Sequence, residues 1–236
     1  MIKNIKFFLK NDSDALKTGK LVKEKMELNG FCINNKYELA ISIGDYELFK
    51  KVIKIHNYSD YINYCFIDLN YFNEEQINKL IDKIKNDEFR ISKLELLKLK
   101  IDMEKYLWTV FAEDKIEIKN SNSEIFNPNI YVGHMNFDNV YETGILISKS
   151  SNRKTMNNII CPGPSVIQIV PLNHQNSLAN SIIVPTCKKI NVALENQKIL
   201  LNIDDINNYY FKTSELEIET IVKKVKSIKL DNYNNK

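Results

Sequence analysis

Up to about residue 90, short apolar runs alternate with longer segments whose apolar residues recur at helical spacing. The apolar runs occupy residues 5–9, 39–43 and 64–69 and predict strands. The β-branched run at 39–43 predicts a buried strand. The periodic segments occupy residues 15–28, 48–53 and 73–85, and they predict amphipathic helices. Strands and helices in regular alternation predict an α/β arrangement, in which helices cover the faces of a parallel sheet.

Polar residues at the ends of the helical segments support this assignment. The cluster Asn-Asp-Ser-Asp at residues 11–14 is typical of a helix N-cap, and that helix is expected to end at Asn29-Gly30. Asn73 is the expected cap of the third helix. Its apolar face consists of Ile77, Leu80, Ile81 and Ile84.

Beyond Glu88 the pattern changes to short strands without helices between them. Residues 97–103 alternate between apolar and charged side chains, as a half-buried strand does. Further short runs, separated by turn-forming residues, fall at residues 106–111, 115–118, 130–135, 144–148, 165–170, 182–184, 190–194 and 198–203. This pattern predicts an all-β second domain, with a boundary near residue 90.

The last part of the chain predicts one more strand. Residues 216–230 alternate between apolar and polar side chains and include Lys223, Lys224, Lys226 and Lys229. We interpret them as an edge strand protected by lysine, with a phosphate-attracting face as the alternative. The expected division is therefore an α/β nucleotide-binding domain at 1–90, an all-β, β-sandwich-like domain at 91–215, and at 216–236 a strand that packs back, followed by a polar tail.

The junction between the second strand and its helix carries the candidate chemistry. Gly44-Asp45 follows the apolar run directly, and a helix that begins there presents free backbone N–H groups to an anion such as phosphate. Glycine would let a ligand approach the backbone, and Asp45 would project from the carboxyl end of a strand, where open α/β sheets bind ligands. The alternative is that Asp45 only caps the helix, with Glu47 in the first turn.

Composition excludes several other classes. A net charge of +3 over 236 residues does not favour nucleic-acid binding. The scattered cysteines (Cys32, Cys65, Cys161 and Cys187) indicate reduced thiols, and the histidines (His56, His134 and His174) lack metal-ligand spacing. No apolar run approaches the length of a membrane span, and the basic N-terminus is too short in apolar residues for a signal peptide. We therefore expect a cytoplasmic protein without a side-chain metal cluster.

The order of an α/β half and an all-β half, with Gly44-Asp45 after the second strand, resembles the NAD kinase family. The family's G-G-D-G-T corresponds to Ile-Gly-Asp-Tyr-Glu at residues 43–47. Its N-E pair corresponds to Glu113-Asp114, and its G-D-G-L-I-V to residues 142–147. The family's T-P-T-G-S-T-A-Y falls on residues 148–156, and Asp204-Asp205 stands where the family places aspartate before glycine or histidine.

The sequence departs from the family pattern at several of these positions. Tyr46 replaces a glycine, Thr143 replaces an aspartate and Glu113 replaces an asparagine. The T-G-H-L-G-F segment that the family carries after its third strand is missing. Lys149, Arg153 and Lys154 bring positive charge to the altered loop, either as substitutes for lost hydrogen-bond donors or as an ordinary solvated loop.

The resemblance implies phosphorylation of the adenosine-ribose 2′-hydroxyl of NAD to give NADP. The donor would be ATP or polyphosphate, used with a divalent cation such as magnesium, and Asp45 would be the general base. The implied nucleotide-binding residues are Gly44, Tyr46, Glu113, Asp114, Thr143, Gly144, Ser148, Ser151, Lys154, Thr155 and Asp205. The resemblance also implies a homo-oligomer.

A second hypothesis is a binding protein on the same scaffold. It would hold an adenine nucleotide or a partner without turnover, because the glycine-rich motifs are reduced. NAD and ATP-like small molecules are the expected ligands under both hypotheses.

Overall fold

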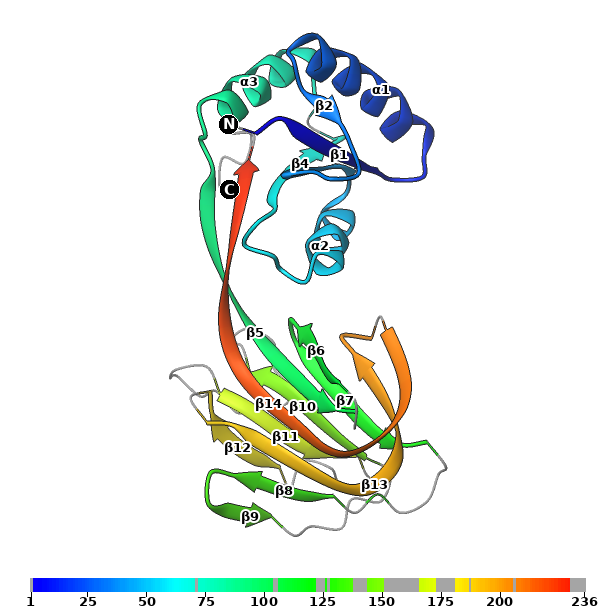
Figure 1. Cartoon of the computed structure of the whole chain (residues 1–236), viewed down its shortest axis with the longest axis vertical. Coiled ribbons are helices and arrows are strands. Elements are labelled where there is room, and N and C mark those ends of the chain that lie inside the picture. Colours follow the sequence, from blue (N-terminus) through cyan, green and yellow to red (C-terminus); the bar gives the residue numbers. More distant parts are fainter. Residues whose placement is uncertain are drawn as a thin grey trace. The chain divides into compact units, whose positions relative to one another are not determined.

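The chain divides into two compact units. The computed structural model describes residues 2–70, 72–103, 106–121, 126, 128–137, 144–150, 166–172, 181–186, 188–205 and 207–229. The first unit contains residues 1–94 and 223–236, and the second contains residues 95–222. Figure 1 shows the elements of both along the chain.

The first unit is a parallel sheet covered by helices. Its elements in chain order are β1 (Asn4–Leu9), α1 (Ser13–Leu28), β2 (Cys32–Ile33), β3 (Leu39–Gly44), α2 (Tyr46–Ile55), β4 (Asn63–Asp68) and α3 (Glu74–Lys85). The strand order is β4-β3-β1-β2, and every pair in it is parallel. Helices α1 and α3 lie on one face and α2 on the other (Figure 1). The alternation predicted for these residues is confirmed, apart from the short β2, which carries too few residues to form a pattern.

Burial explains why the apolar runs became strands. Every residue of β3 is buried, since helices cover both faces of the sheet. On α2 the predicted apolar residues Phe49, Val52 and Ile53 are buried. On α3 the predicted face of Ile77, Leu80, Ile81 and Ile84 is buried, and Asn73 forms a capping box with Gln76.

The second unit consists of strands. They are β6 (Leu107–Ala112), β7 (Lys115–Asn120), β8 (Asn129–Val132), β9 (Met135–Phe137), β10 (Gly144–Ser150), β11 (Val166–Pro171), β12 (Ile182–Pro185) and β13 (Ile190–Ile203). Most of β5 (Arg90–Asp102) and β14 (Asn207–Lys229) also belongs to this unit. The principal strand order is β12-β11-β10-β7-β13-β14, and neighbouring strands are antiparallel. The core contains mainly isoleucine, leucine and valine.

Three strand predictions need correction. The run at 130–135 is a hairpin of β8 and β9, because Gly133 adopts φ +63° and turns the chain. The runs at 190–194 and 198–203 are one strand, β13, whose pairing with β14 shifts between Ala193 and Gln197, where Glu195 has φ +47°. Strand β14 begins at Asn207, well before the predicted residue 216.

The lysine-rich end of β14 adds a strand to the parallel sheet of the first unit. Residues 226–229 pair in parallel with residues 63–66 of β4. Val225, Ser227 and Ile228 are buried there, while Lys224 and Lys226 are exposed. Of this segment, Ile228 belongs to the apolar core of the first unit.

Gly144 marks a close approach between two backbones. A Cβ atom at this position would lie 2.3 Å from the carbonyl oxygen of Ile118 and 2.9 Å from Cγ of Lys119 on the neighbouring strand β7. The resemblance implied that Gly144 admits a nucleotide, but the carbonyl oxygen of Ile118 already fills the space that a side chain would need.

We predict that Gly144→Ala destabilises the protein. Because backbone atoms of β7 must move, the cost should be about 1–3 kcal/mol in the free energy of unfolding, as for other overpacked sites. The control is Gly30→Ala, where no atom lies within 4 Å of the added Cβ and only the φ of +86° opposes the change. Urea unfolding measures both variants, and a smaller loss for Gly144→Ala than for Gly30→Ala would contradict the prediction.

A half-buried histidine lies among aromatic rings in the first unit. His56 Nδ1 lies 2.6 Å from the carbonyl oxygen of Val52, and a carbonyl oxygen only accepts, so Nδ1 carries the proton and donates it in this hydrogen bond. The other ring nitrogen, Nε2, therefore accepts a hydrogen bond from the hydroxyl group of Tyr37. The rings of Phe8 and Tyr64 also contact His56 edge-on. Burial, with a smaller contribution from Lys6, holds the pKa of His56 below its usual value of 6.5, against the hydrogen bond to Val52.

We predict that stability falls as the solution is acidified through this pKa range. Below about pH 6.5 the unfolded chain binds a proton that folded His56 resists, so the free energy of unfolding decreases as pH falls. His56→Phe should remove this part of the pH dependence, whereas His134→Gln, at an exposed turn, should leave it in place. Urea unfolding at several pH values measures the effect, and identical profiles for the three proteins would contradict it.

Candidate active site

A cavity of about 490 Å³ lies at the carboxyl ends of β1, β3 and β4. Its lining residues come from the segments that follow these three strands and from the first turns of α1. They are Lys10, Asp12, Asp14, Lys17, Thr18, Gly44, Asp45, Leu69, Asn70 and Phe72. The chain leaves β1 for α1 on one face of the sheet and β3 for α2 on the other (Figure 1), which is the place where open parallel sheets bind ligands.

The two carboxylate oxygens of Asp45 have different partners. Oδ1 accepts a hydrogen bond from the backbone N–H of Leu48 at 2.9 Å, so Asp45 is the N-cap of α2. Oδ2 lies 3.1 Å from Nζ of Lys10. Both predicted roles of Asp45 therefore coexist geometrically: one oxygen caps the helix, and the other lies beside a cation at the cavity.

These contacts keep Asp45 ionised. The hydrogen bond from Leu48 and, second, that from Lys10 hold the pKa of the Asp45 carboxyl below its ordinary value, and Asp45 in turn raises the pKa of Lys10. The side chains of Asp45 and Lys10 are 48% and 50% exposed, so solvent and small solutes can reach the pair. An accessible carboxylate of this kind can accept a proton from a bound hydroxyl group.

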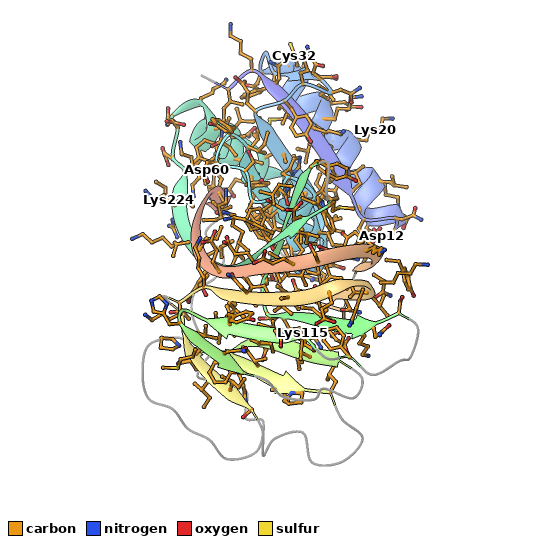
Figure 2. The ribbon with its side chains drawn as sticks, turned by 60° about the horizontal axis from the view of Figure 1, so that its bottom comes forward. Asp12, Lys20, Cys32, Asp60, Lys115 and Lys224 are labelled. Carbon is orange, nitrogen blue, oxygen red and sulfur yellow. The ribbon has the colours of Figure 1, made fainter. Side chains whose placement is uncertain are left out.

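The N-terminus of a second helix opens onto the same cavity. Asp12, labelled in Figure 2 at the start of α1, accepts a hydrogen bond from Ala15 N at 2.8 Å and is the N-cap of that helix. Lys10 lies between the two caps, since its Nζ is also 3.7 Å from Oδ2 of Asp12. Lys17 and Thr18 line the cavity from α1. Two helix N-termini and two lysines, which attract phosphate groups, thus lie at this cavity beside the carboxylates of Asp12, Asp14 and Asp45.

Tyr46, which replaces a glycine of the family motif, lies apart from this cavity. Its ring contacts Phe49 and Phe66, with ring centroids 5.8 and 6.1 Å away. Nζ of Lys50 lies 5.1 Å from the Tyr46 ring centroid. The side chain is about half exposed and is not among the described residues that line the cavity. Its bulk therefore leaves the cavity beside Asp45 open.

A second group of predicted residues is assembled in the other unit. Backbone N–H groups of Glu113, Asp114 and Lys115 donate to the carboxylate of Asp204 at 2.9–3.0 Å. Lys115, labelled in Figure 2, also pairs with Oδ2 of Asp205 at 2.6 Å. Ser148 lies opposite Lys115 on β10.

Asp204 is thus the organising residue of this group, a role that its position in the motif did not indicate. It fixes the turn that contains Glu113 and Asp114 through three backbone hydrogen bonds, while Asp204 and Asp205 both adopt left-handed φ values near +50° and +57°. Of the other predicted residues, Thr143, Ser151, Lys154 and Thr155 lie outside the described residues.

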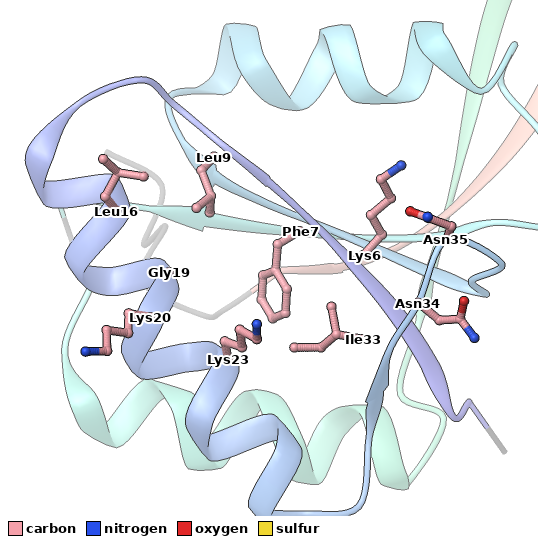
Figure 3. A pocket seen from close by; sticks show the side chains of 10 residues that line it. All are labelled: Lys6, Phe7, Leu9, Leu16, Gly19, Lys20, Lys23, Ile33, Asn34 and Asn35. Carbon is pink, nitrogen blue, oxygen red and sulfur yellow. The ribbon is translucent and has the colours of Figure 1, made fainter.

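A further cavity, of about 580 Å³, lies between α1 and the edge formed by β1 and β2 (Figure 3). It is lined by Lys6, Lys20 and Lys23 around Phe7 and Ile33, among others. In Figure 3 the ammonium groups of Lys6 and Lys20 point away from Phe7, and Nζ of Lys6 instead lies 5.3 Å from the ring centroid of Tyr37. Only Lys23 directs its charge toward Phe7, so this cavity lacks the convergent polar groups of the first.

Within the part of the chain that the structure describes, no group of three or more His, Cys, Asp or Glu side chains is arranged to hold a metal ion. None of the described helices combines the length and apolar character needed to cross a membrane. Cys65 is a free, buried thiol, and burial raises its pKa to about 12, which makes it unreactive.

The residues that sequence reasoning missed are Lys10, Lys17, Thr18 and Asn70, all at the cavity. Lys10 and Asn70 directly follow the predicted strands β1 and β4. Parallel strands bring their carboxyl ends to one edge, so residues just after each strand were candidates for the site of Asp45. Lys17 and Thr18 carried no such signal, because they belong to the polar surface of a helix.

Comparison with known proteins yields one related sequence and related structures. The chain is 24% identical over 213 residues to the NAD kinase of Finegoldia magna, covering 81% of this chain and 77% of that protein. No family model matches the chain. The fold is similar to that of an NAD kinase from Archaeoglobus fulgidus, solved in complex with ATP, with a TM-score of 0.58 and 12% identity over 97% of this chain and 94% of that one. Yeast NADH kinase, solved with NADH, gives a TM-score of 0.63 and 10% identity over 98% of this chain and 84% of that one.

The two functions of Asp45 can be separated by substitution. Asn accepts the Leu48 N–H as well as Asp does, so Asp45→Asn should change the free energy of unfolding little, whereas Asp45→Ala should lower it by about 1 kcal/mol. Urea unfolding of both variants measures this difference. Equal losses for Asn and Ala would mean that the ion pair with Lys10, and not the cap, stabilises the folded protein.

Proposed function

We propose that this chain, whose sequence is similar to an NAD kinase and whose fold is similar to NAD and NADH kinases, phosphorylates the adenosine-ribose 2′-hydroxyl of NAD to give NADP. The sequence similarity to an NAD kinase and the similarity of fold to NAD and NADH kinases both support the proposal. The observation that carries it is the Asp45 carboxylate, which is ionised and presents one oxygen at a cavity between two helix N-termini. The comparisons do not favour a catalytically impaired binding protein.

In the proposed reaction Asp45 acts as the general base. Oδ2 accepts the proton of the 2′-hydroxyl while the hydroxyl oxygen forms a bond to the terminal phosphorus of the donor. The bond between that phosphorus and its bridging oxygen breaks, leaving ADP when ATP is the donor or a shortened chain when polyphosphate is used. Oδ1 remains on the N–H of Leu48, so the carboxylate keeps its position throughout.

Phosphate binding is assigned to the cavity in the first unit. The helix N-termini of α1 and α2 and the lysines at positions 10 and 17 supply positive charge to the donor phosphates. Gly44 lines the cavity next to Asp45. In this proposal Tyr46 lies only at the edge of the phosphate site, because its ring packs on Phe49 and Phe66.

The acceptor nucleotide is assigned to the group around Asp204. Glu113 and Asp114 would accept hydrogen bonds from ribose hydroxyls or the adenine amino group. Gly144, Ser148 and Asp205 belong to the same proposed site. The predicted hydroxyl groups and cation of this site lie outside the described residues and remain proposals; they belong to Thr143, Ser151, Thr155 and Lys154.

Magnesium is the proposed cation, carried by the donor phosphates. Magnesium in kinases is usually held by one or two carboxylates together with substrate phosphates and water, so a cluster of three protein ligands is not required. The ammonium group of Lys10 already lies between the carboxylates of Asp12 and Asp45, so in this proposal the donor phosphates and water hold the cation. When bound, the cation would neutralise charge on the transferred phosphoryl group.

We also propose the finer features that the resemblance implies. They are a domain boundary near residue 90, a β-sandwich-like arrangement of the second domain, a cytoplasmic location and a homo-oligomeric state. Size-exclusion chromatography with light scattering tests the last of these.

The test of function is NADP formation by purified protein given NAD, magnesium, and ATP or polyphosphate. We expect NADP with at least one donor, and a decrease of about 10²- to 10⁴-fold in Asp45→Asn because general base catalysis is lost. The control is Asp60→Asn, an exposed aspartate labelled in Figure 2 that precedes β4 at the opposite end of the strand. If the wild-type protein forms no more NADP than Asp45→Asn with ATP and also with polyphosphate, the proposal is refuted.

A further inference from the structure

Gly44 leaves space that Lys10 fills. A Cβ atom at position 44 would lie 2.8 Å from Cβ and 3.5 Å from Cδ of Lys10, and 3.2 Å from Cδ2 of Leu48. Contacts of 2.8 Å are closer than carbon atoms approach in folded proteins, so any side chain at position 44 would displace the stem of Lys10. The glycine of this motif is therefore in contact with a side chain of the same protein, where the sequence suggested a ligand.

The backbone of Lys10 is fixed at the same place. Its N–H donates to the carbonyl oxygen of Ile43 at 3.0 Å, which extends the pairing of β1 with β3 by one residue. Its carbonyl oxygen accepts the N–H of Asp12 at 2.9 Å in the turn that leads to α1. Lys10 thus follows β1 directly, and its side chain lies over the end of the neighbouring strand β3.

The head group of Lys10 then reaches the outer oxygen of Asp45. Nζ lies 3.1 Å from Oδ2, on the side opposite to the Leu48 N–H that holds Oδ1. Each carboxylate oxygen consequently has its own donor, one from the backbone of α2 and one from the segment after β1. A single surface ion pair is weak, but a carboxylate held at both oxygens has a restricted orientation.

We propose that Lys10, seated against Gly44, is a positioning residue that holds the Asp45 carboxylate toward the cavity. This inference rests on the proposed function, since it assigns Lys10 a role through the proposed general base. It also gives a reason for the single glycine that remains of the family motif: a side chain at position 44 would displace the stem of Lys10, and the φ of +157° independently disfavours any residue but glycine. Gly44, Lys10 and Asp45 act as one unit.

The proposal predicts that the effects of Gly44→Ala and Lys10→Met do not add in the double variant. If Gly44→Ala acts on the Asp45 carboxylate by displacing Lys10, then combining it with Lys10→Met should raise the Asp45 pKa and lower kcat no more than either change does alone. Independent roles would instead multiply the two effects. Gly19→Ala is the matched control, because its Cβ would meet Leu9 at 2.9 Å in the same unit without touching Lys10.

The first measurement does not depend on turnover. The titration of the Asp45 carboxyl is followed by carboxyl NMR in the wild type, Lys10→Met, Lys10→Arg, Gly44→Ala and the double variant, with Asp45→Asn to assign the signal. We expect the Asp45 pKa to rise in Lys10→Met and Gly44→Ala, to rise no further in the double variant, and to stay low in Lys10→Arg. The charged groups that share the cavity or act on this carboxylate, Asp12, Asp14, Lys17 and Lys51, are unchanged in all five proteins.

The second measurement is the kinetics of NADP formation. We expect Lys10→Met to lower kcat about 10-fold with little change in KM for NAD, below the roughly 100-fold that a displacement of about 1 Å can cost. Lys10→Arg should recover most of this loss. An unchanged Asp45 pKa in Lys10→Met, or multiplicative losses in the double variant, would overturn the proposal.

The two measurements separate the two proposals. A wild-type protein without NADP formation would refute the proposed function, while the titration would still decide whether Lys10 holds Asp45. If Gly44→Ala does not fold, the comparison of Lys10→Met with Lys10→Arg decides the role of Lys10. A loss of thermal stability in Lys10→Met with unchanged titration and kcat would show that Lys10 only supports the fold.

Discussion

The candidate site depends on how one carboxylate divides its two oxygens between a helix and a cation. Oδ1 of Asp45 accepts the N–H of Leu48 and so begins α2, while Oδ2 lies beside Lys10. The parallel pairing of β1 with β3 makes this possible, because it brings the residues that follow both strands to the same edge. The helix cap and the proposed catalytic base are thus the same side chain in the same conformation.

This arrangement removes the conflict between two interpretations of Asp45. When only the sequence was considered, capping and catalysis were alternative roles for Asp45. Either role alone would account for an aspartate at this position. In the structure the cap orients the side chain and leaves half of the carboxylate accessible, as the 48% exposure of Asp45 indicates. The cap is therefore compatible with the role of general base that we propose for Asp45.

The sequence predicted the first unit well because its signals are local. Apolar runs such as residues 39–43 and caps such as Asp12 and Asn73 are determined by neighbouring residues, and the structure places strands and helices accordingly. The strands of the second unit were harder to delimit. The irregularity in β13 depends on Glu195 adopting a left-handed conformation. The start of β14 depends on its pairing with β13. Neither feature follows from the residues next to it in the sequence.

The site was only partly predictable for the same reason. Asp45 was found because glycine and aspartate at a strand-to-helix junction form a local signal, whereas Lys10 lies 35 positions earlier and meets Asp45 only through the parallel pairing of β1 with β3. Asp204 was noted only as part of a motif, although it anchors the turn at Glu113 and Asp114 through three backbone hydrogen bonds. Glycines were misleading in one respect, since Gly44 and Gly144 both face atoms of the protein itself.

The most direct test is a crystal structure of the protein in complex with NAD and a non-hydrolysable ATP analogue. The account predicts that a carboxylate oxygen of Asp45 lies within about 3 Å of the adenosine-ribose 2′-hydroxyl, with Oδ1 still on the N–H of Leu48. A bound NAD whose 2′-hydroxyl lies far from Asp45, with the cavity beside Lys10 containing neither nucleotide, would contradict it.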